Sequence, residues 1–178
     1  MKTNKKIVIT GAPGTGKTSV INALKNKNYK CLPEISRQIT LEARENGIEQ
    51  LFLTDPLLFS RKLLEGRIKQ YKEAELLEGT VFLDRGIPDV IAYMDYAKDD
   101  YPQYFNDACK KYHYKQVFLL PSWEDIYTSD NERYENYEEA EQIHHYLKAA
   151  YENCGYDLIE VPKDTVENRV EFILNQLD

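Results

Sequence analysis

Short runs of aliphatic and aromatic residues alternate along this chain with longer segments in which apolar residues recur every three or four positions. The short runs are rich in Val, Ile, Leu and Phe, which is typical of strands covered on both faces. Five strands are predicted, at 6–10, 30–32, 80–84, 116–120 and 157–161. Strands that alternate with helices in this way indicate an α/β fold with a mostly parallel, doubly wound sheet.

The helical segments carry recognisable start and stop signals. The first helix is expected to begin at Lys17, directly after a glycine-rich loop. A longer helix has Asp55 as its expected N-cap and Pro56 at its first position, which proline favours. A third is expected to end just before Gly155, and the last to open with a capping box that starts at Asp164.

Length, charge and cysteine content narrow the classes of protein. A chain of 178 residues suits a single domain, so we expect one domain over 1–178. The net charge of −7 argues against general binding of nucleic acid or an anionic membrane, because both require a basic surface. The three cysteines form no CxxC pair, and no apolar run is long enough for an export signal or a membrane span. A cytoplasmic protein is therefore expected.

The segment 11–18, Gly-Ala-Pro-Gly-Thr-Gly-Lys-Thr, matches the pattern GxxxxGK[ST] in full and lies between a predicted strand and a predicted helix. Glycines let backbone N–H groups surround phosphate oxygens, the lysine reaches the outer phosphates, and the last hydroxyl binds Mg²⁺. A P-loop NTPase fold that binds ATP or GTP with Mg²⁺ is predicted. The expected nucleotide-binding residues are Gly11, Gly14, Thr15, Gly16, Lys17, Thr18 and Ser19.

A P-loop needs an acidic partner for the metal ion, usually at the end of a neighbouring strand. Asp84 ends the strand at 80–84 and is followed by Arg85. We therefore predict Asp84 and Thr18 as the magnesium partners and Arg85 as a substrate contact. The alternative interpretation is a turn at the strand end with a surface ion pair.

Glu34 follows the second strand, and the next helix is expected to begin within 35–37. A carboxylate at this place can hold an acceptor hydroxyl, or accept its proton, in line with the γ-phosphate. Arg37, one turn further on, can pair with Glu34 or with an anionic substrate group. The alternative is an acidic residue that complements the helix dipole and forms an exposed ion pair.

The fourth strand is followed by a polar stretch that we interpret as a lid over about 122–138. Arg133 is its single cation among many acidic residues. Phosphoryl transfer requires positive charge over the γ-phosphate, so Arg133 is the predicted catalytic residue of the lid, together with Lys17, Glu34 and Asp84. The alternative is a helix-surface arginine paired with neighbouring glutamates.

Five segments together resemble one known family over nearly the whole chain. They are GAPGTGKTS, LPEISRQI, VFLDRGIPD, VFLLPSWEDIYTSDNER, and GYDLIEVP with TVENRVEFIL after it. They are similar to the AAA-labelled P-loop group that includes relatives of the NadR ribosylnicotinamide kinase domain, described as NadR/Ttd-like, and more distantly to nucleoside and nucleotide kinases.

The resemblance implies a small-molecule kinase whose acceptor is nucleoside-like, with nicotinamide riboside as one example. It gives Glu34 the role of base for the acceptor hydroxyl, Arg85 a contact to substrate or phosphate, and Arg133 the charge of the lid. The group also includes a GTP-binding trafficking protein, so a regulatory ATP- or GTP-binding module without a small acceptor is the alternative. The expected partners are a nucleoside triphosphate and an unidentified small-molecule acceptor.

Overall fold

Five parallel strands form the centre of the protein in the computed structural model, which describes residues 4–127 and 135–177. Every strand pair is parallel, and the order across the sheet is β2-β3-β1-β4-β5. The predicted α/β fold with a doubly wound sheet is therefore confirmed. The strands are β1 (Lys5–Gly11), β2 (Lys30–Leu32), β3 (Thr80–Asp84), β4 (Gln116–Leu120) and β5 (Ile159–Glu160).

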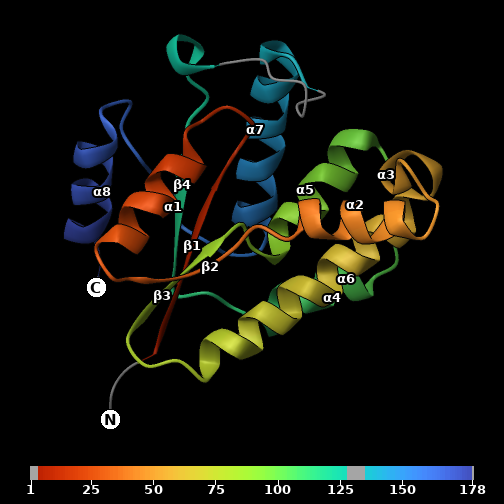
Figure 1. Ribbon diagram of the computed structural model, residues 1–178, viewed down its shortest axis with the longest axis horizontal. Helices are drawn as coiled ribbons and strands as arrows, with labels where there is room; N and C mark the ends of the chain where they lie inside the picture. The colour runs from red at the N-terminus through yellow and green to blue at the C-terminus, as the bar shows by residue number, and fades with distance from the viewer. Residues whose placement is uncertain (1–3, 128–134, 178) are drawn as a thin grey trace.

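Helices cover both faces of the sheet (Figure 1). On one face α1 and α8 pack on Ile7, Ile9 and Phe82, and on the other α4, α5, α6 and α7 pack on Val8 and Leu83. The side chains of a strand alternate between the two faces, which is why neighbours such as Ile7 and Val8 enter different cores. The helices are α1 (Lys17–Asn26), α2 (Ser36–Glu45), α3 (Leu51–Thr54), α4 (Pro56–Glu75), α5 (Ile87–Ala97), α6 (Tyr104–Lys111), α7 (Tyr137–Asn153) and α8 (Val166–Asn175), with a 3₁₀ turn η1 (Glu124–Ile126).

The strand predictions agree closely with the structure, except at the last strand. The bounds of β2, β3 and β4 are those expected, and β1 is one residue longer at each end. The prediction of 157–161 for β5 is too long, because only Ile159 and Glu160 pair with β4. Val161 still donates its N–H to the Leu119 carbonyl at 2.9 Å, and Pro162 then has no N–H to continue the ladder.

The helix caps are partly as expected. Asp55 accepts a hydrogen bond from the first turn of α4, and α7 ends before Gly155, whose φ is 84°. The last helix forms as predicted, but the expected capping box at Asp164 is wrong. Thr165 is the N-cap of α8 and accepts from the Asn168 N–H at 3.2 Å, while Asp164 lies outside the helix and bonds the N–H of Thr165. Two adjacent capping residues compete here, and the second one begins the helix.

Three helices, α3, α5 and α6, were not among the predicted elements. Nearly every residue in the first two turns of α5 is buried, from Ile87 to Ala92, so its sequence shows no polar stripe to mark a helical period. Within the described ranges, none of the helices is both long and apolar enough to cross a membrane.

The register of the sheet brings the predicted functional positions to one edge. Asp84 lies beside Ile9 of β1, two residues before the glycine-rich loop begins, and the Arg85 N–H bonds the Ile9 carbonyl at 3.0 Å. Leu32 lies beside Leu83, so Glu34 leaves β2 next to the end of β3. In an open α/β sheet this carboxyl edge is where ligands bind.

Candidate functional site

The loop between β1 and α1 has a backbone that only glycine can follow at two positions. At Gly16 φ is 84°, a left-handed value, and an added Cβ would lie 2.9 Å from the Arg169 guanidinium. At Gly11 an added Cβ would lie 2.7 Å from the Leu120 carbonyl oxygen. The first helical residue after this loop is Lys17, so the unpaired N–H groups of the first turn of α1 face the loop. Backbone amides at a helix N-terminus are the groups that bind phosphate.

The Lys17 ammonium lies against the loop itself. Its Nζ donates to the carbonyl oxygens of Gly11 at 2.9 Å and Ala12 at 3.2 Å. Burial lowers the pKa of Lys17 from 10.5 to about 7, and Arg85 adds to this, although Asp84 and other nearby carboxylates oppose it. A bound phosphate would stabilise the charged form of this ammonium, because it adds negative charge next to Lys17.

Nucleotide binding is therefore expected to take up a proton at about pH 8, where Lys17 is largely neutral in the free protein and phosphate returns its pKa toward the ordinary value. The affinity for the nucleotide should fall as the pH rises above 7, because the pKa of Lys17 in the free protein is lowered to about 7. Above that pH, Lys17 must first take up a proton from solution before it can pair with the phosphate. Calorimetric titration with ATP in two buffers of different ionisation enthalpy measures the uptake.

The matched control for this experiment is Lys62→Met, which removes an exposed lysine of α4 and should keep the uptake. An observed binding enthalpy that is the same in both buffers contradicts the expectation.

Asp84 ends β3 as a buried carboxylate with an unused oxygen. Its Oδ1 is buried and has no hydrogen-bond partner in the described part of the chain. Burial raises the pKa of Asp84, while Lys17 and Arg85 oppose that rise. Thr18 lies in the first turn of α1 with its side chain exposed. A buried oxygen without a partner and a hydroxyl in the first turn after the phosphate loop fit Mg²⁺, which takes oxygen ligands and often keeps water and substrate phosphates among them.

The variant Asp84→Asn tests this assignment. We expect it to raise the Mg²⁺ concentration needed for half-maximal nucleotide turnover by about 10- to 100-fold, because an amide oxygen is a weaker partner than a carboxylate for a hard cation. A Mg²⁺ titration of the turnover rate gives the shift. Asp100→Asn, which changes an exposed carboxylate after α5, should leave the titration unchanged. An unaltered Mg²⁺ requirement in Asp84→Asn would remove Asp84 from the metal site.

Glu34 is held by a residue from a distant helix. Its Oε1 lies 2.6 Å from Nη2 of Arg67 in α4, and its Oε2 accepts from the N–H of Ser36 at 2.8 Å and from the Ser36 hydroxyl. Arg67 also donates through Nη1 to the Asp84 carbonyl at 2.8 Å. Burial favours the neutral acid, but Arg67 and Arg85 outweigh it and lower the pKa of Glu34 to about 2. Glu34 is therefore a fixed, ionised carboxylate.

The alternative interpretation of Glu34 holds in part, and its role at an acceptor hydroxyl stays a prediction. The carboxylate does bond the first N–H of α2, as an acid that complements a helix dipole would. The ion pair is not exposed, however, because the Arg67 side chain is only 3% accessible. Arg37 lies exposed on α2, and Glu34 forms its ion pair with Arg67. The role of Arg37 as a substrate contact stays a prediction.

Arg85 forms a buried ion pair, so the alternative of a surface pair at the strand end is wrong. Its Nη1 lies 3.0 Å from Oδ1 of Asp89, and the two side chains are 13% and 3% exposed. Asp89 also accepts from the Thr10 hydroxyl at 2.7 Å and from the Tyr151 hydroxyl. Arg85 itself has a φ of 72°, a value that non-glycine residues rarely adopt and that is common at functional sites.

Three charged residues of the site were not predicted from the sequence: Arg67, Asp89 and Arg169. Asp89 stands four residues after Arg85, which is ion-pair spacing within a helix. Arg67 occupies the buried face of α4 between Leu64 and Tyr71. A charge on an apolar face is the signal that would have pointed to Arg67, because buried charges are almost always paired.

The predicted lid is described only at its two ends. Arg133 lies outside the described residues, so its role stays a prediction. On the near side, Trp123 leads into η1, and its Nε1 donates to Asp125 at 3.0 Å. On the far side, the Glu135 carbonyl accepts from the Tyr127 hydroxyl, so residues 127 and 135 lie together.

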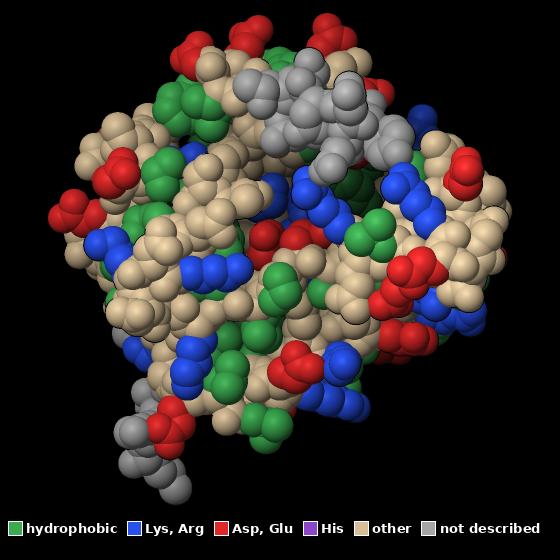
Figure 2. All heavy atoms as spheres, viewed as in Figure 1, with side chains coloured by type: hydrophobic (Ala, Val, Ile, Leu, Met, Phe, Trp, Pro, Cys, Tyr) green, Lys and Arg blue, Asp and Glu red, His purple; other side chains and the backbone are tan. Residues whose placement is uncertain are grey.

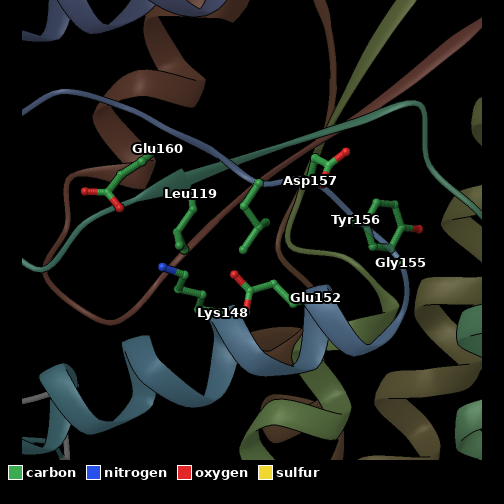
Figure 3. Close-up of a pocket in the computed structure, with 8 residues that line it drawn as sticks. Leu119, Lys148, Glu152, Gly155, Tyr156, Asp157 and Glu160 are labelled. Atoms are coloured by element: carbon green, nitrogen blue, oxygen red, sulfur yellow. The ribbon is translucent and has the colours of Figure 1, made fainter.

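Basic and acidic side chains gather in a hollow near the middle of the face in Figure 2. A separate open pocket lies between α7 and the last two strands, where Lys148 and Glu152 of α7 face Leu119 and Glu160 (Figure 3). No residue of the phosphate loop lines that pocket, and its charges are mixed. The candidate site is therefore the carboxyl edge of the sheet.

Comparison with known proteins agrees with this fold. A family model described as an AAA domain matches residues 6–169. Deoxyadenosine kinase from M. mycoides superimposes with a TM-score of 0.69 at 19% identity, over 96% of this chain and 97% of that one. Thymidylate kinase from Ehrlichia chaffeensis gives 0.66 at 13% identity, over 98% of both chains.

A third solved structure is similar over part of its length. The NadR protein in complex with NR gives a TM-score of 0.70 at 18% identity, over 97% of this chain and 50% of that one. A search among curated proteins gives no match. At these identities the structural likeness shows the fold of this chain.

Proposed function

The chain belongs to the AAA domain family, and on that premise we propose that it is an ATP- and Mg²⁺-dependent kinase that phosphorylates a small, nucleoside-like molecule. The observation that carries the proposal is the ionised Glu34, held by Arg67 at the same sheet edge as the phosphate loop. Storage of a nucleotide needs no such carboxylate. The names of the similar structures, deoxyadenosine kinase, thymidylate kinase and NadR in complex with NR, support the choice of acceptor class.

In the proposed reaction, Lys17 and the amides of the loop hold the outer phosphates and neutralise charge on the transferring group. Thr18 and Asp84 hold Mg²⁺, which when bound neutralises further charge on the phosphates. The acceptor hydroxyl donates a hydrogen bond to Glu34. A bond forms from the acceptor oxygen to the γ-phosphorus, the bond from that phosphorus to the ADP oxygen breaks, and the hydroxyl proton passes to Glu34 and on to water.

The low pKa of Glu34 fits an orienting role better than that of a strong base. A carboxylate with a pKa of about 2 draws little on the proton of a hydroxyl before the new bond forms. Phosphoryl transfer has a loose transition state, so aligning the hydroxyl contributes more than removing its proton early. Arg67 and Ser36 fix the carboxylate for this purpose, since both bond it directly.

Arg85 is proposed to contact the acceptor or its phosphate. Asp89 and the ring of Tyr93, whose centroid lies 5.3 Å from the guanidinium carbon, hold Arg85 in one orientation. Burial raises the pKa of Tyr93 to about 12, so the phenol stays neutral and can donate a hydrogen bond to a substrate oxygen. Arg133 is the proposed lid charge, and nicotinamide riboside is one candidate acceptor.

The proposal is tested by measuring ADP formation from Mg²⁺-ATP with and without members of an acceptor panel. The panel contains nicotinamide riboside, deoxynucleosides and thymidine monophosphate. At least one acceptor should raise ADP formation above the acceptor-free rate and yield a phosphorylated product. If no member of the panel changes the rate of ADP formation, although the protein binds the nucleotide tightly, the result supports a regulatory nucleotide-binding module without a small acceptor.

A further inference from the structure

Arg169 is the largest fully buried side chain of the described residues and has no assigned role. It lies on the first turn of α8 and is 1% exposed. Its Nη1 donates to the carbonyl oxygen of Thr15 at 2.9 Å, which joins the C-terminal helix to the phosphate loop across 154 residues of sequence. The same nitrogen lies 2.9 Å from where a Cβ of Gly16 would stand. Arg169 therefore packs directly behind the loop.

The Arg169 charge has no counter-charge in the part of the chain that the structure describes. Its Nε and Nη2 have no hydrogen-bond partner there, although both are buried. Burial alone lowers the pKa of Arg169, with no carboxylate acting against it. A buried, unpaired guanidinium is costly, and an arginine that only packed would be replaceable by an apolar residue. An anion bound on the other side of the loop would offset that cost.

Arg169 also contacts the start of the predicted lid. The ring of Trp123 lies over its guanidinium, and the ring centroid is 5.8 Å from the guanidinium carbon. Ile126 of η1 approaches to 3.5 Å of the Cβ position at Gly16. The guanidinium thus has the phosphate loop on one side and the first residues after β4 on the other.

We propose that Arg169 is a positioning residue for the nucleotide: it holds the Thr15–Gly16 peptide from behind and adds a second buried positive charge, beside Lys17, for the phosphates. This inference rests on the proposed nucleotide dependence of the site. The attraction between charges grows with the charge of the ligand. The contribution of Arg169 to affinity is therefore largest for ATP and smallest for AMP. If Arg169 only supported the fold, its substitution would weaken the binding of all three nucleotides by the same factor.

Two variants separate charge from packing. Arg169→Gln keeps an N–H donor on a shorter side chain but removes the charge, whereas Arg169→Lys keeps the charge. Calorimetric titration with ATP, ADP and AMP is expected to show ATP binding about tenfold weaker in Arg169→Gln, with a smaller loss for ADP and little loss for AMP. Arg169→Lys should retain most of the ATP affinity. Arg61→Gln, an exposed arginine of α4, is the control for removing one positive charge.

The inference is overturned if Arg169→Gln loses the same affinity for all three nucleotides. It is also overturned if Arg169→Lys binds ATP as weakly as Arg169→Gln. Trp123 is the only tryptophan of the chain, so the wild-type protein supplies a second measurement that needs no variant. Addition of ATP should change its emission with the same saturation as in calorimetry, and an unchanged emission also overturns the inference. None of these measurements depends on an acceptor. Failure of the kinase proposal would appear as turnover that does not respond to acceptors, so it can be distinguished from failure of the inference about Arg169.

Discussion

Replacing Lys17 by methionine is expected to lower turnover about a thousandfold or more while the protein remains folded. The Lys17 ammonium lies in the loop where the outer phosphates are expected to bind, at 2.9 and 3.2 Å from the carbonyl oxygens of Gly11 and Ala12. Methionine has a similar length and fills the same space without the charge. The loss should therefore appear in kcat, because the charge on the transferring group is greatest during the reaction. Steady-state ADP formation measures it.

The control for this variant is Lys62→Met, on the exposed surface of α4. Circular dichroism and a thermal melt establish that both proteins fold. A reduction of less than about tenfold for Lys17→Met would show that this lysine is not the principal phosphate contact.

The variant Glu34→Gln is expected to lower acceptor-dependent turnover about 100-fold and to leave ATP binding nearly unchanged. Glutamine has the same shape, but it carries no charge to attract the hydroxyl proton. The change also leaves the buried Arg67 without its ionic partner, so the thermal midpoint should fall as well. Kinetics with saturating ATP and a varied acceptor separate the catalytic loss from a binding loss.

Glu42→Gln removes an exposed carboxylate from α2 and serves as the matched control. If Glu34→Gln lowers acceptor-free ATP hydrolysis as strongly as acceptor phosphorylation, Glu34 acts on the nucleotide rather than on the acceptor.

The sequence was sufficient to predict the parts of the site that are local in the chain. The loop from Gly11 to Thr18 is contiguous, and its glycines are required by a left-handed φ and by close contacts that a motif encodes directly. Asp84 follows a strongly apolar strand, so its place at the carboxyl edge follows from strand direction alone. Buried parallel strands are recognisable because both of their faces are apolar.

Contacts between distant segments were not predictable in the same way. Arg37 is near Glu34 in sequence, but the structure pairs Glu34 with Arg67, 33 residues away, because α4 returns across the end of β3. Arg169 reaches Thr15 across 154 residues. Such pairs depend on how helices pack on the sheet, which periodicity does not specify. The assignment of Arg133 to the lid stays a prediction from composition.

Transfer of a phosphoryl group from ATP to a small acceptor defines the proposed activity, and mass spectrometry can detect its product. The purified protein is incubated with a metabolite extract, Mg²⁺ and ATP labelled at the γ-phosphate, beside Lys17→Met as the inactive reference. We predict a newly labelled, nucleoside-like phosphate ester in the wild-type reaction alone. Label that appears only in inorganic phosphate would show that the protein hydrolyses ATP without transferring its phosphoryl group to an acceptor.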